Sequence, residues 1–201
     1  MSEDEWAEYA GGWDDNVDTR RYAGMAFDSW KQDVSTLLPE LASGRVLDFG
    51  CGTGLLAERF LPLCRELVGV DPSPGMMAVF NGKISKRCSK NITGLTCQVN
   101  HETIASLPQL SEGFDLIIAS SVCSFLPDYE ATLVDLSALL NAGGFFVQWD
   151  WATDMPAKRM DDAFSAAGLC SVSTDQAFEI EIDGQSLPVR MGVAKSVHCR
   201  D

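Results

Sequence analysis

The sequence predicts an α/β protein with a doubly wound, mostly parallel sheet. Apolar stretches that suit buried strands alternate along the chain with stretches that suit helices, as in a parallel sheet joined by crossover helices. Residues 114–122 are almost entirely apolar, as expected for a strand covered on both faces. Residues 45–49 form a similar strand that enters a turn with three glycines. Ligands of such sheets bind at the carboxyl ends of the strands.

The first 38 residues are expected to form a helical lid segment, and residues 39–201 a single ligand-binding domain. A helix is expected over about residues 22–38, ended by Pro39. Tyr9 and Trp13 are four positions apart, so on a helix they share one face. These two rings, or that of Tyr22, are expected to cover a bound ligand. The alternative is that the aromatic side chains only pack the first helix on the sheet.

The turn after the first strand reads Asp48-Phe-Gly-Cys-Gly-Thr-Gly. Glycines permit unusual dihedrals and let a ligand approach the backbone. The G-x-G-x-G spacing differs from the dinucleotide fingerprint G-x-G-x-x-G, and nothing marks a phosphate site. The alternative is a turn without a ligand.

A second apolar strand, over residues 66–71, ends in Asp71, 21 residues after Gly50. A carboxylate at this place can accept hydrogen bonds from the paired hydroxyls of a ribose. The alternative for Asp71 is an ordinary acid at a strand end or helix cap.

Both motifs resemble those of the class I S-adenosylmethionine-dependent methyltransferases, in particular the type 11/12-like domain. Asp48 with the glycine turn resembles the first motif of that family, and Asp71-Pro-Ser-Pro-Gly-Met-Met resembles its D-x-S-x-x-M-L motif. The resemblance covers about residues 40–195. It implies a Rossmann-like, seven-stranded sheet in the order 3-2-1-4-5-7-6, with strand 7 antiparallel and helices on both faces.

The resemblance also implies S-adenosyl-L-methionine as the cofactor. In the family the glycine turn holds the methionine end, the acid grips the ribose, and the next helix lays an apolar residue near the adenine. After the third strand, expected over residues 93–99, one residue more than the usual spacing is present; Glu102 is expected to accept the adenine amino group, and Thr103 or Ile104 to offer a backbone N–H. The expected cofactor-binding residues are Asp48, Gly50, Cys51, Gly52, Asp71, Pro72, Met76, Glu102, Thr103 and Ser120.

The ends of the fourth and fifth strands are expected to line the substrate pocket. Many relatives have two histidines where this chain has Cys123 and Ser124; their absence favours a substrate that needs little proton abstraction, or a base elsewhere. Ser124 could equally cap the next helix, and the tryptophans of the fifth strand, Trp149 and Trp151, could equally be core residues. The expected substrate-binding residues are Tyr9, Trp13, Ser121, Ser124, Trp149 and Asp150.

The C-terminal third suits two helices, one strand and a hairpin. A helix is expected over residues 131–140, followed by a strand over 145–149 and a last helix over 160–167. Residues 178–193 have the pattern of two strands joined at Asp183-Gly184, a favoured hairpin turn.

The composition of the chain argues against several classes of partner and ligand. The chain has 201 residues and a net charge of −14, which repels phosphate backbones and argues against a nucleic-acid partner. No apolar run approaches membrane-spanning length, and the acidic N-terminus is unlike a signal peptide. Seven cysteines without a C-x-x-C pair suggest reduced thiols in a cytoplasmic protein, and two histidines argue against a metal site.

The expected function is methyl transfer from S-adenosylmethionine to a small-molecule acceptor by in-line displacement. The sulfonium is already an activated donor, so no dedicated catalytic residue is required; Asp150, Tyr9 or His101 could remove a proton if one is used. The alternatives are a non-catalytic binding protein of the same fold and, less favoured, a nicotinamide-dependent oxidoreductase. The acceptor, its reacting atom and the oligomeric state stay open.

Overall fold

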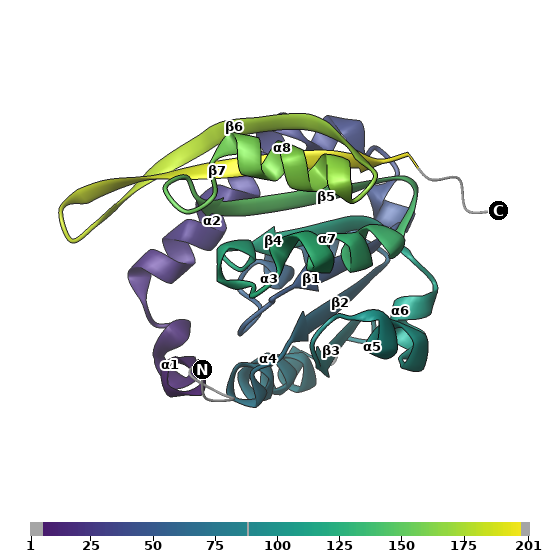
Figure 1. The fold of residues 1–201 in the computed structure, drawn as a ribbon. Helices are drawn as coiled ribbons and strands as arrows, with labels where there is room; N and C mark the ends of the chain where they lie inside the picture. The colour runs from purple at the N-terminus through teal and green to yellow at the C-terminus, as the bar shows by residue number, and fades with distance from the viewer. Residues whose placement is uncertain (1–5, 88, 198–201) are drawn as a thin grey trace.

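The computed structural model describes residues 6–87 and 89–197, which fold around one seven-stranded sheet (Figure 1). The sheet order is β3-β2-β1-β4-β5-β7-β6. Strands β1 to β5 are parallel neighbours, and β7 runs antiparallel to both β5 and β6. The expected order and the antiparallel seventh strand are therefore confirmed. The strands are β1 (Arg45–Phe49), β2 (Glu66–Asp71), β3 (Ile92–Thr96), β4 (Phe114–Ser120), β5 (Leu140–Trp151), β6 (Leu169–Ile182) and β7 (Gln185–Ser196).

Helices cover both faces of the sheet. Figure 1 shows α7 and α8 in front of the strands and α2 behind them. The helices are α1 (Ala7–Trp13), α2 (Val17–Asp33), α3 (Ala57–Phe60), α4 (Pro74–Arg87), α5 (His101–Ser106), α6 (Pro108–Ser111), α7 (Tyr129–Ala138) and α8 (Ala157–Ala166). Short 3₁₀ turns lie at Ser35–Leu37, Leu41–Ser43, Leu61–Leu63 and Cys123–Phe125.

Alternation along the strands divides the core into two clusters. In β4, Leu116 and Ile118 pack toward α2 and α3, whereas Ile117 and Ala119 pack toward α7 and α8. Successive side chains of a strand point to opposite faces, so a strand covered by helices on both sides must be apolar throughout. The continuous apolar run in the sequence has this cause.

The N-terminal segment differs from the expected single helix over residues 22–38. Helix α2 begins five residues earlier, because the side chain of Asn16 accepts hydrogen bonds from the backbone N–H groups of Asp18 (2.8 Å) and Thr19 (3.2 Å) and so caps the helix. It also ends earlier, at Asp33, and a separate helix, α1, precedes it. Gly24 lies inside α2 without interrupting it.

The C-terminal hairpin is longer than expected. Strands β6 and β7 pair along their whole length, from Leu169 opposite Ser196 to Ile182 opposite Gln185. Asp183 (φ 51°) and Gly184 (φ 76°) form the turn, with the positive φ angles that a tight hairpin requires. Its far end extends beyond β5 (Figure 1). Among the described helices, none is long and apolar enough to cross a membrane.

The five cysteines within the described residues are free thiols, and three of them, Cys51, Cys64 and Cys123, are buried. Cys88 and Cys199 lie outside the described residues.

Candidate active site

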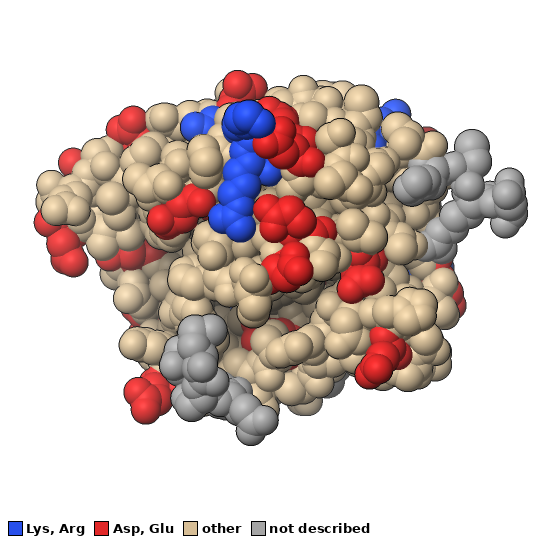
Figure 2. Space-filling view, viewed as in Figure 1, with Lys and Arg blue, Asp and Glu red and all other residues tan. Residues whose placement is uncertain are grey.

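A cavity of about 460 Å³ lies at the carboxyl ends of the parallel strands, where open α/β sheets bind ligands. Its volume falls within the range of about 300–1,000 Å³ that is usual for ligand pockets. Figure 2 shows the molecule hollowed in this region, with acidic atoms visible inside. The lining residues are Trp6, Trp13, Asn16, Asp18, Thr19, Tyr22, Ala23, Asp48, Gly50, Cys51, Gly52, Leu55, Leu56, Asp71, Pro72, Met76, Ser120, Ser121, Val122, Phe125, Trp151 and Ile182.

The glycine turn forms the floor of one half of the cavity. Gly50 has a φ of +68°, and a Cβ there would lie 2.4 Å from Cγ2 of Val122. The turn is anchored because the N–H groups of Gly50 and Cys51 both donate to the carbonyl of Val70 (2.9 and 3.0 Å). A side chain at position 50 would require both a strained backbone and a displaced neighbour, which explains the glycine.

Asp71 ties the end of β2 to this turn. One carboxylate oxygen accepts the N–H of Gly52 at 2.9 Å, and the other accepts the N–H of Ser73 at 2.8 Å. These bonds fix the carboxylate at the cavity wall.

Asp48 is the second carboxylate in this half and is only 1% exposed. Its Oδ2 atom is buried without a hydrogen-bond partner. Burial, and then the charge of Asp71, raise the pKa of Asp48 to about 8, although a hydrogen bond from the backbone of Ala57 works in the opposite direction. An unpaired carboxylate oxygen on a cavity wall suits a ligand that carries positive charge.

Helix α1 is attached beside the glycine turn. Asp14, which follows the helix, accepts a hydrogen bond from Thr53 Oγ1 at 2.6 Å and forms an ion pair with Lys83 at 2.6 Å. At the other end of the helix, a Cβ on Gly75 would lie 2.7 Å from Cα of Ala7, so α1 packs tightly on α4 there. These contacts join the N-terminal segment to the glycine turn after β1 and to α4.

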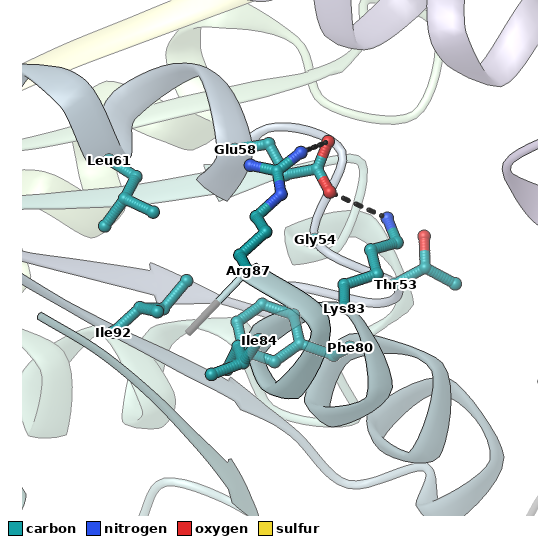
Figure 3. A pocket seen from close by; sticks show the side chains of 9 residues that line it. All are labelled: Thr53, Gly54, Glu58, Leu61, Phe80, Lys83, Ile84, Arg87 and Ile92. Carbon is teal, nitrogen blue, oxygen red and sulfur yellow. Dashed lines mark ion pairs between the residues drawn. The ribbon is translucent and has the colours of Figure 1, made fainter. Parts of the chain in front are cut away.

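Lys83 belongs to a small surface network behind the turn. Glu58 pairs with Lys83 at 3.4 Å and with Arg87 at 3.1 Å (Figure 3). Thr53 and Phe80 also line this shallow depression, whose volume of about 20 Å³ is that of a packing defect rather than of a ligand site.

Aromatic rings wall the other half of the cavity. Trp6 meets Phe125 edge to face, with ring centroids 5.5 Å apart, and Trp13 at 6.0 Å. Across from them the ring of Tyr22 meets Trp151 at 5.2 Å. These residues come from α1, α2, β5 and the 3₁₀ turn after β4, which the fold brings together.

Ser121 links the two halves. It has a φ of +54°, a region that non-glycine residues seldom adopt, and its N–H donates to the carbonyl of Trp149 at 2.7 Å. The bond holds the strained residue in place at the end of β4, next to Ser120.

Ten of the residues expected at the site from the sequence line the cavity. Eight come from the cofactor set, namely Asp48, Gly50, Cys51, Gly52, Asp71, Pro72, Met76 and Ser120, and two from the substrate set, Trp13 and Ser121.

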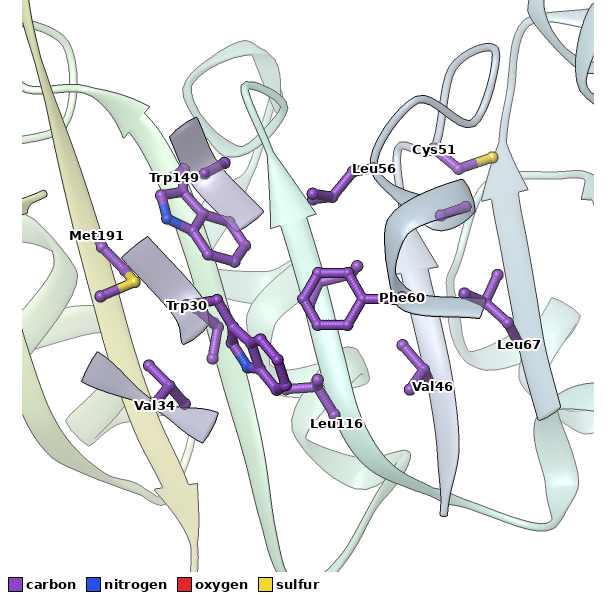
Figure 4. Close-up of a cluster of buried hydrophobic side chains, with 14 of the residues drawn as sticks. Trp30, Val34, Val46, Cys51, Leu56, Phe60, Leu67, Leu116, Trp149 and Met191 are labelled. Carbon is purple, nitrogen blue, oxygen red and sulfur yellow. The ribbon is translucent and has the colours of Figure 1, made fainter. Parts of the chain in front are cut away.

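Three expected substrate residues at the ends of β4 and β5 do not line the cavity. Trp149 is fully buried between α2 and the sheet, where its indole N–H donates to Ser29 Oγ at 2.9 Å (Figure 4). Asp150 is also fully buried and accepts hydrogen bonds from Ser124 N (3.2 Å) and Gln148 Nε2 (3.1 Å). The backbone N–H of Ser124 is therefore used by this buried carboxylate. Of the two tryptophans of β5, only Trp151 reaches the cavity, because it lies at the strand end.

Four other expected residues also lie away from the cavity. Thr103 forms a capping box at the start of α5: its N–H donates to Asn100 Oδ1, and its Oγ1 accepts from Asn100 N, both at 3.0 Å. The N–H of Thr103 is thus already used, and Glu102 and His101 are exposed on the same helix. Tyr9 is 60% exposed and contacts Trp6 outside the cavity.

Several lining residues were not expected. Asn16, Asp18 and Thr19 are brought to the cavity by the start of α2, and Ile182 by the far end of the hairpin. The cap signal Asn16-x-x-Thr19 was present in the sequence and would have placed the helix start correctly. Trp6 and Phe125 carry no local signal, since only the fold brings them together.

Comparison with known proteins agrees with this geometry. A family model described as "Methyltransferase domain" matches residues 47–146. Two ubiquinone biosynthesis O-methyltransferases, from Ruegeria sp. and Ruegeria pomeroyi, are 32% and 34% identical to the chain over 113 and 126 residues. The matches cover 56% and 63% of this chain but only 43% and 46% of those relatives.

Solved structures of low sequence identity share the fold. The N-methyltransferase NodS from Bradyrhizobium japonicum, crystallised with S-adenosyl-L-homocysteine, has a TM-score of 0.66 at 18% identity, covering 98% of this chain and 94% of that one. A putative methyltransferase in complex with the Haloferax volcanii Trm112 methyltransferase activator has a TM-score of 0.68 at 17% identity, covering 98% and 100%. The motif match, the relatives and the sheet order agree, and the chain belongs to the class I S-adenosylmethionine-dependent methyltransferase family.

Proposed function

We propose that the chain binds S-adenosyl-L-methionine in the described cavity and methylates a small molecule. The observation that carries this proposal is Asp48, whose buried, unpaired Oδ2 faces the same cavity as the carboxylate of Asp71. Burial and the neighbouring charge of Asp71 keep Asp48 protonated in the empty cavity near neutral pH, and a ligand with an ammonium and a sulfonium group can take the place of that proton.

The residues that would hold the cofactor follow from the donor set. Asp71 would accept hydrogen bonds from the ribose hydroxyls, Asp48 would face the positively charged methionine end, and Met76 would contact the adenine. Glycines at the turn let the backbone approach the ligand. The bound cofactor would supply a methyl group on a positively charged sulfur. The neutral thioether that remains after transfer is a good leaving group.

The acceptor is proposed to react through a hydroxyl oxygen, as the names of the two Ruegeria relatives indicate for those proteins. In that reaction the hydroxyl oxygen would form the bond to the methyl carbon as the carbon–sulfur bond breaks with its electron pair on sulfur, and the hydroxyl proton would pass to a base or to water. The protein aligns the two reactants and excludes water.

We assign the N-terminal segment a lid role. Helix α1 is attached to the glycine turn through Asp14 and Thr53, and Trp6 and Trp13 line the cavity beneath it. The acidic surface, seen as scattered red atoms in Figure 2, supports the prediction that nucleic acid is not a partner, and the free thiols support a cytoplasmic location.

Isothermal titration with S-adenosylmethionine, S-adenosylhomocysteine and NADH tests the cofactor assignment. We expect the first two to bind and NADH not to bind; NADH binding alone would favour an oxidoreductase. Incubation with methyl-labelled cofactor and a metabolite extract, followed by mass spectrometry, then tests transfer. Cofactor binding with no labelled product from any extract would favour a non-catalytic protein of the same fold.

A further inference from the structure

The cavity is divided along the sheet into two halves of different chemistry. The half over β1 and β2 contains the glycine turn, Asp48 and Asp71. The half over β4, β5 and the hairpin is lined instead by side chains of α1, α2 and the two strand ends. If the cofactor occupies the first half, as proposed above, the acceptor must enter the second. This inference rests on that assignment.

The second half has walls of aromatic rings that meet edge to face. Tyr22 lies between Trp151 and Phe178, with ring centroids 5.2 and 5.5 Å away, and both contacts are edge to face. Trp6 is held in the same manner against Phe125 and Trp13. Aromatic walls with fixed orientations favour a planar ligand, which can stack on them or meet their edges.

No lysine, arginine or histidine among the described residues lines the cavity, whereas three carboxylates do: Asp18, Asp48 and Asp71. Asp150, a fourth acid, lies behind the wall and is fully buried. An acceptor with a carboxylate or phosphate group would lose its hydration here and find acidic side chains but no basic side chain of the described residues to pair with. An uncharged acceptor meets no such penalty.

The hydroxyl of Tyr22 is a buried polar atom of the aromatic wall that has no hydrogen-bond partner within the geometric limits, and the side chain of Ser121 is the polar group that lies near it. Burial, and then the charge of Asp150, raise the pKa of Tyr22 well above its usual value, so the group is a neutral hydroxyl that can both donate and accept a hydrogen bond. An unpaired buried hydroxyl is costly unless a ligand completes it.

We propose that this half is a compartment for a planar acceptor that carries no negative charge, and that the Tyr22 hydroxyl positions the acceptor by hydrogen bonding to its hydroxyl group. Tyr22 then acts as a positioning residue at the boundary between the two halves, next to Ser121. Its ring cannot turn away, since Trp151 and Phe178 hold it on both sides.

The charge preference is tested with two probes that differ in a single group, 6-hydroxy-2-naphthamide and 6-hydroxy-2-naphthoate. Each is titrated into the full chain saturated with S-adenosylhomocysteine. We expect the uncharged amide to bind at least about tenfold more tightly than the carboxylate, because the carboxylate faces acids and no cation. Equal or tighter binding of the carboxylate, or no binding of either probe, overturns the proposal. Failure of S-adenosylhomocysteine itself to bind refutes the proposed function instead.

The role of Tyr22 is tested with Tyr22→Phe, which keeps the ring and its packing. We expect the variant to bind 6-hydroxy-2-naphthamide about 5- to 20-fold more weakly. The affinity for 2-naphthamide, which lacks the hydroxyl, and the affinity for the cofactor should stay unchanged. Tyr129→Phe is the matched control: its buried hydroxyl donates to Gln148 at 2.7 Å and does not line the cavity. Equal weakening of both probes by Tyr22→Phe would mean that the residue is only structural.

Discussion

The two halves of the cavity are built in opposite ways. The half over β1 and β2 comes from two short stretches of sequence, and its ligand groups are backbone amides and two carboxylates fixed by the sheet. The half over β4 and β5 is assembled from α1, α2, a strand end and a hairpin that are far apart in the chain. The first is therefore rigid and tied to folding, whereas the second can vary without disturbing the sheet.

The largest effect is expected where the first half and the core coincide, at Gly50. In Gly50→Ala, the positive φ and the approach of the new Cβ to Val122 (2.4 Å) together should lower the free energy of unfolding by about 2–5 kcal/mol and abolish cofactor binding. Urea unfolding and titration calorimetry measure both quantities.

Gly82→Ala is the matched control, because no atom lies within 4 Å of the new Cβ on α4. It should stabilise the helix by up to about 1 kcal/mol and leave binding intact. If Gly50→Ala kept the stability and the cofactor binding of this control, the glycine turn would not be a rigid part of the first half of the cavity.

The second largest effect is expected from Asp71→Ala. The carboxylate accepts hydrogen bonds from two backbone N–H groups and is proposed to hold the ribose. Its loss should therefore weaken the binding of S-adenosylhomocysteine by about 10- to 100-fold. Asp162→Ala, which breaks only an exposed ion pair with Lys158, should change the dissociation constant little. An unaltered dissociation constant in Asp71→Ala would contradict the ribose role.

This contrast also explains what the sequence could predict. The glycine turn and the acid at the end of β2 are each encoded by consecutive residues, so the local pattern sufficed for them, whereas the order of the strands was implied by the resemblance to the family. The residues at the end of β5 show the limit: Trp149, Asp150 and Trp151 look alike as candidates, yet only Trp151 lies on the cavity. Alternation assigns each side chain to a face of the sheet, but it does not say where the covering helix stops.

The residues after β3 that were expected to meet the adenine lie away from the cavity for a local reason. Asn100 and Thr103 form a capping box, which starts a helix at His101 and uses the N–H of Thr103 that was expected to meet the adenine. The box pattern is visible in the sequence, but the resemblance to the family drew attention to Glu102 instead. Trp6 and Phe125 are far apart in the sequence and meet at the cavity, so they could be recognised only in the fold.

Asp48 and Asp150 are both buried acids, but only Asp48 lines the cavity, so the two should differ in their effect on the pH dependence of binding. The pKa of Asp48 is raised to about 8, so below pH 8 the carboxyl is protonated in the empty cavity. A cationic ligand favours the ionised form, so binding must expel that proton as the pH falls below 8. The dissociation constant of S-adenosylmethionine should therefore rise about tenfold from pH 7 to pH 6, a range in which the ammonium group of the ligand keeps its proton, as measured by calorimetry in buffers of different ionisation enthalpy.

Asp150 provides the internal comparison for this pH effect. Burial raises its pKa to about 7, but both of its oxygens are hydrogen-bonded and it does not line the cavity. Asp48→Asn should therefore remove the pH dependence of binding, and Asp150→Asn should retain it. A flat pH profile in the unmodified chain would show that the ligand does not meet Asp48.

The smallest effect is expected at the joint between the lid and the turn. Thr53→Val removes the hydroxyl that donates to Asp14 at 2.6 Å but leaves the ion pair of Asp14 with Lys83. One of the two polar contacts of Asp14 is then lost while α1 stays packed on α4, and release of S-adenosylhomocysteine should accelerate about threefold, with a smaller change in the association rate. Stopped-flow tryptophan fluorescence can follow this, because Trp6 and Trp13 line the cavity. Thr96→Val on the exposed edge strand β3 is the control, and an equal release rate in the two variants would mean that α1 does not gate the cofactor half.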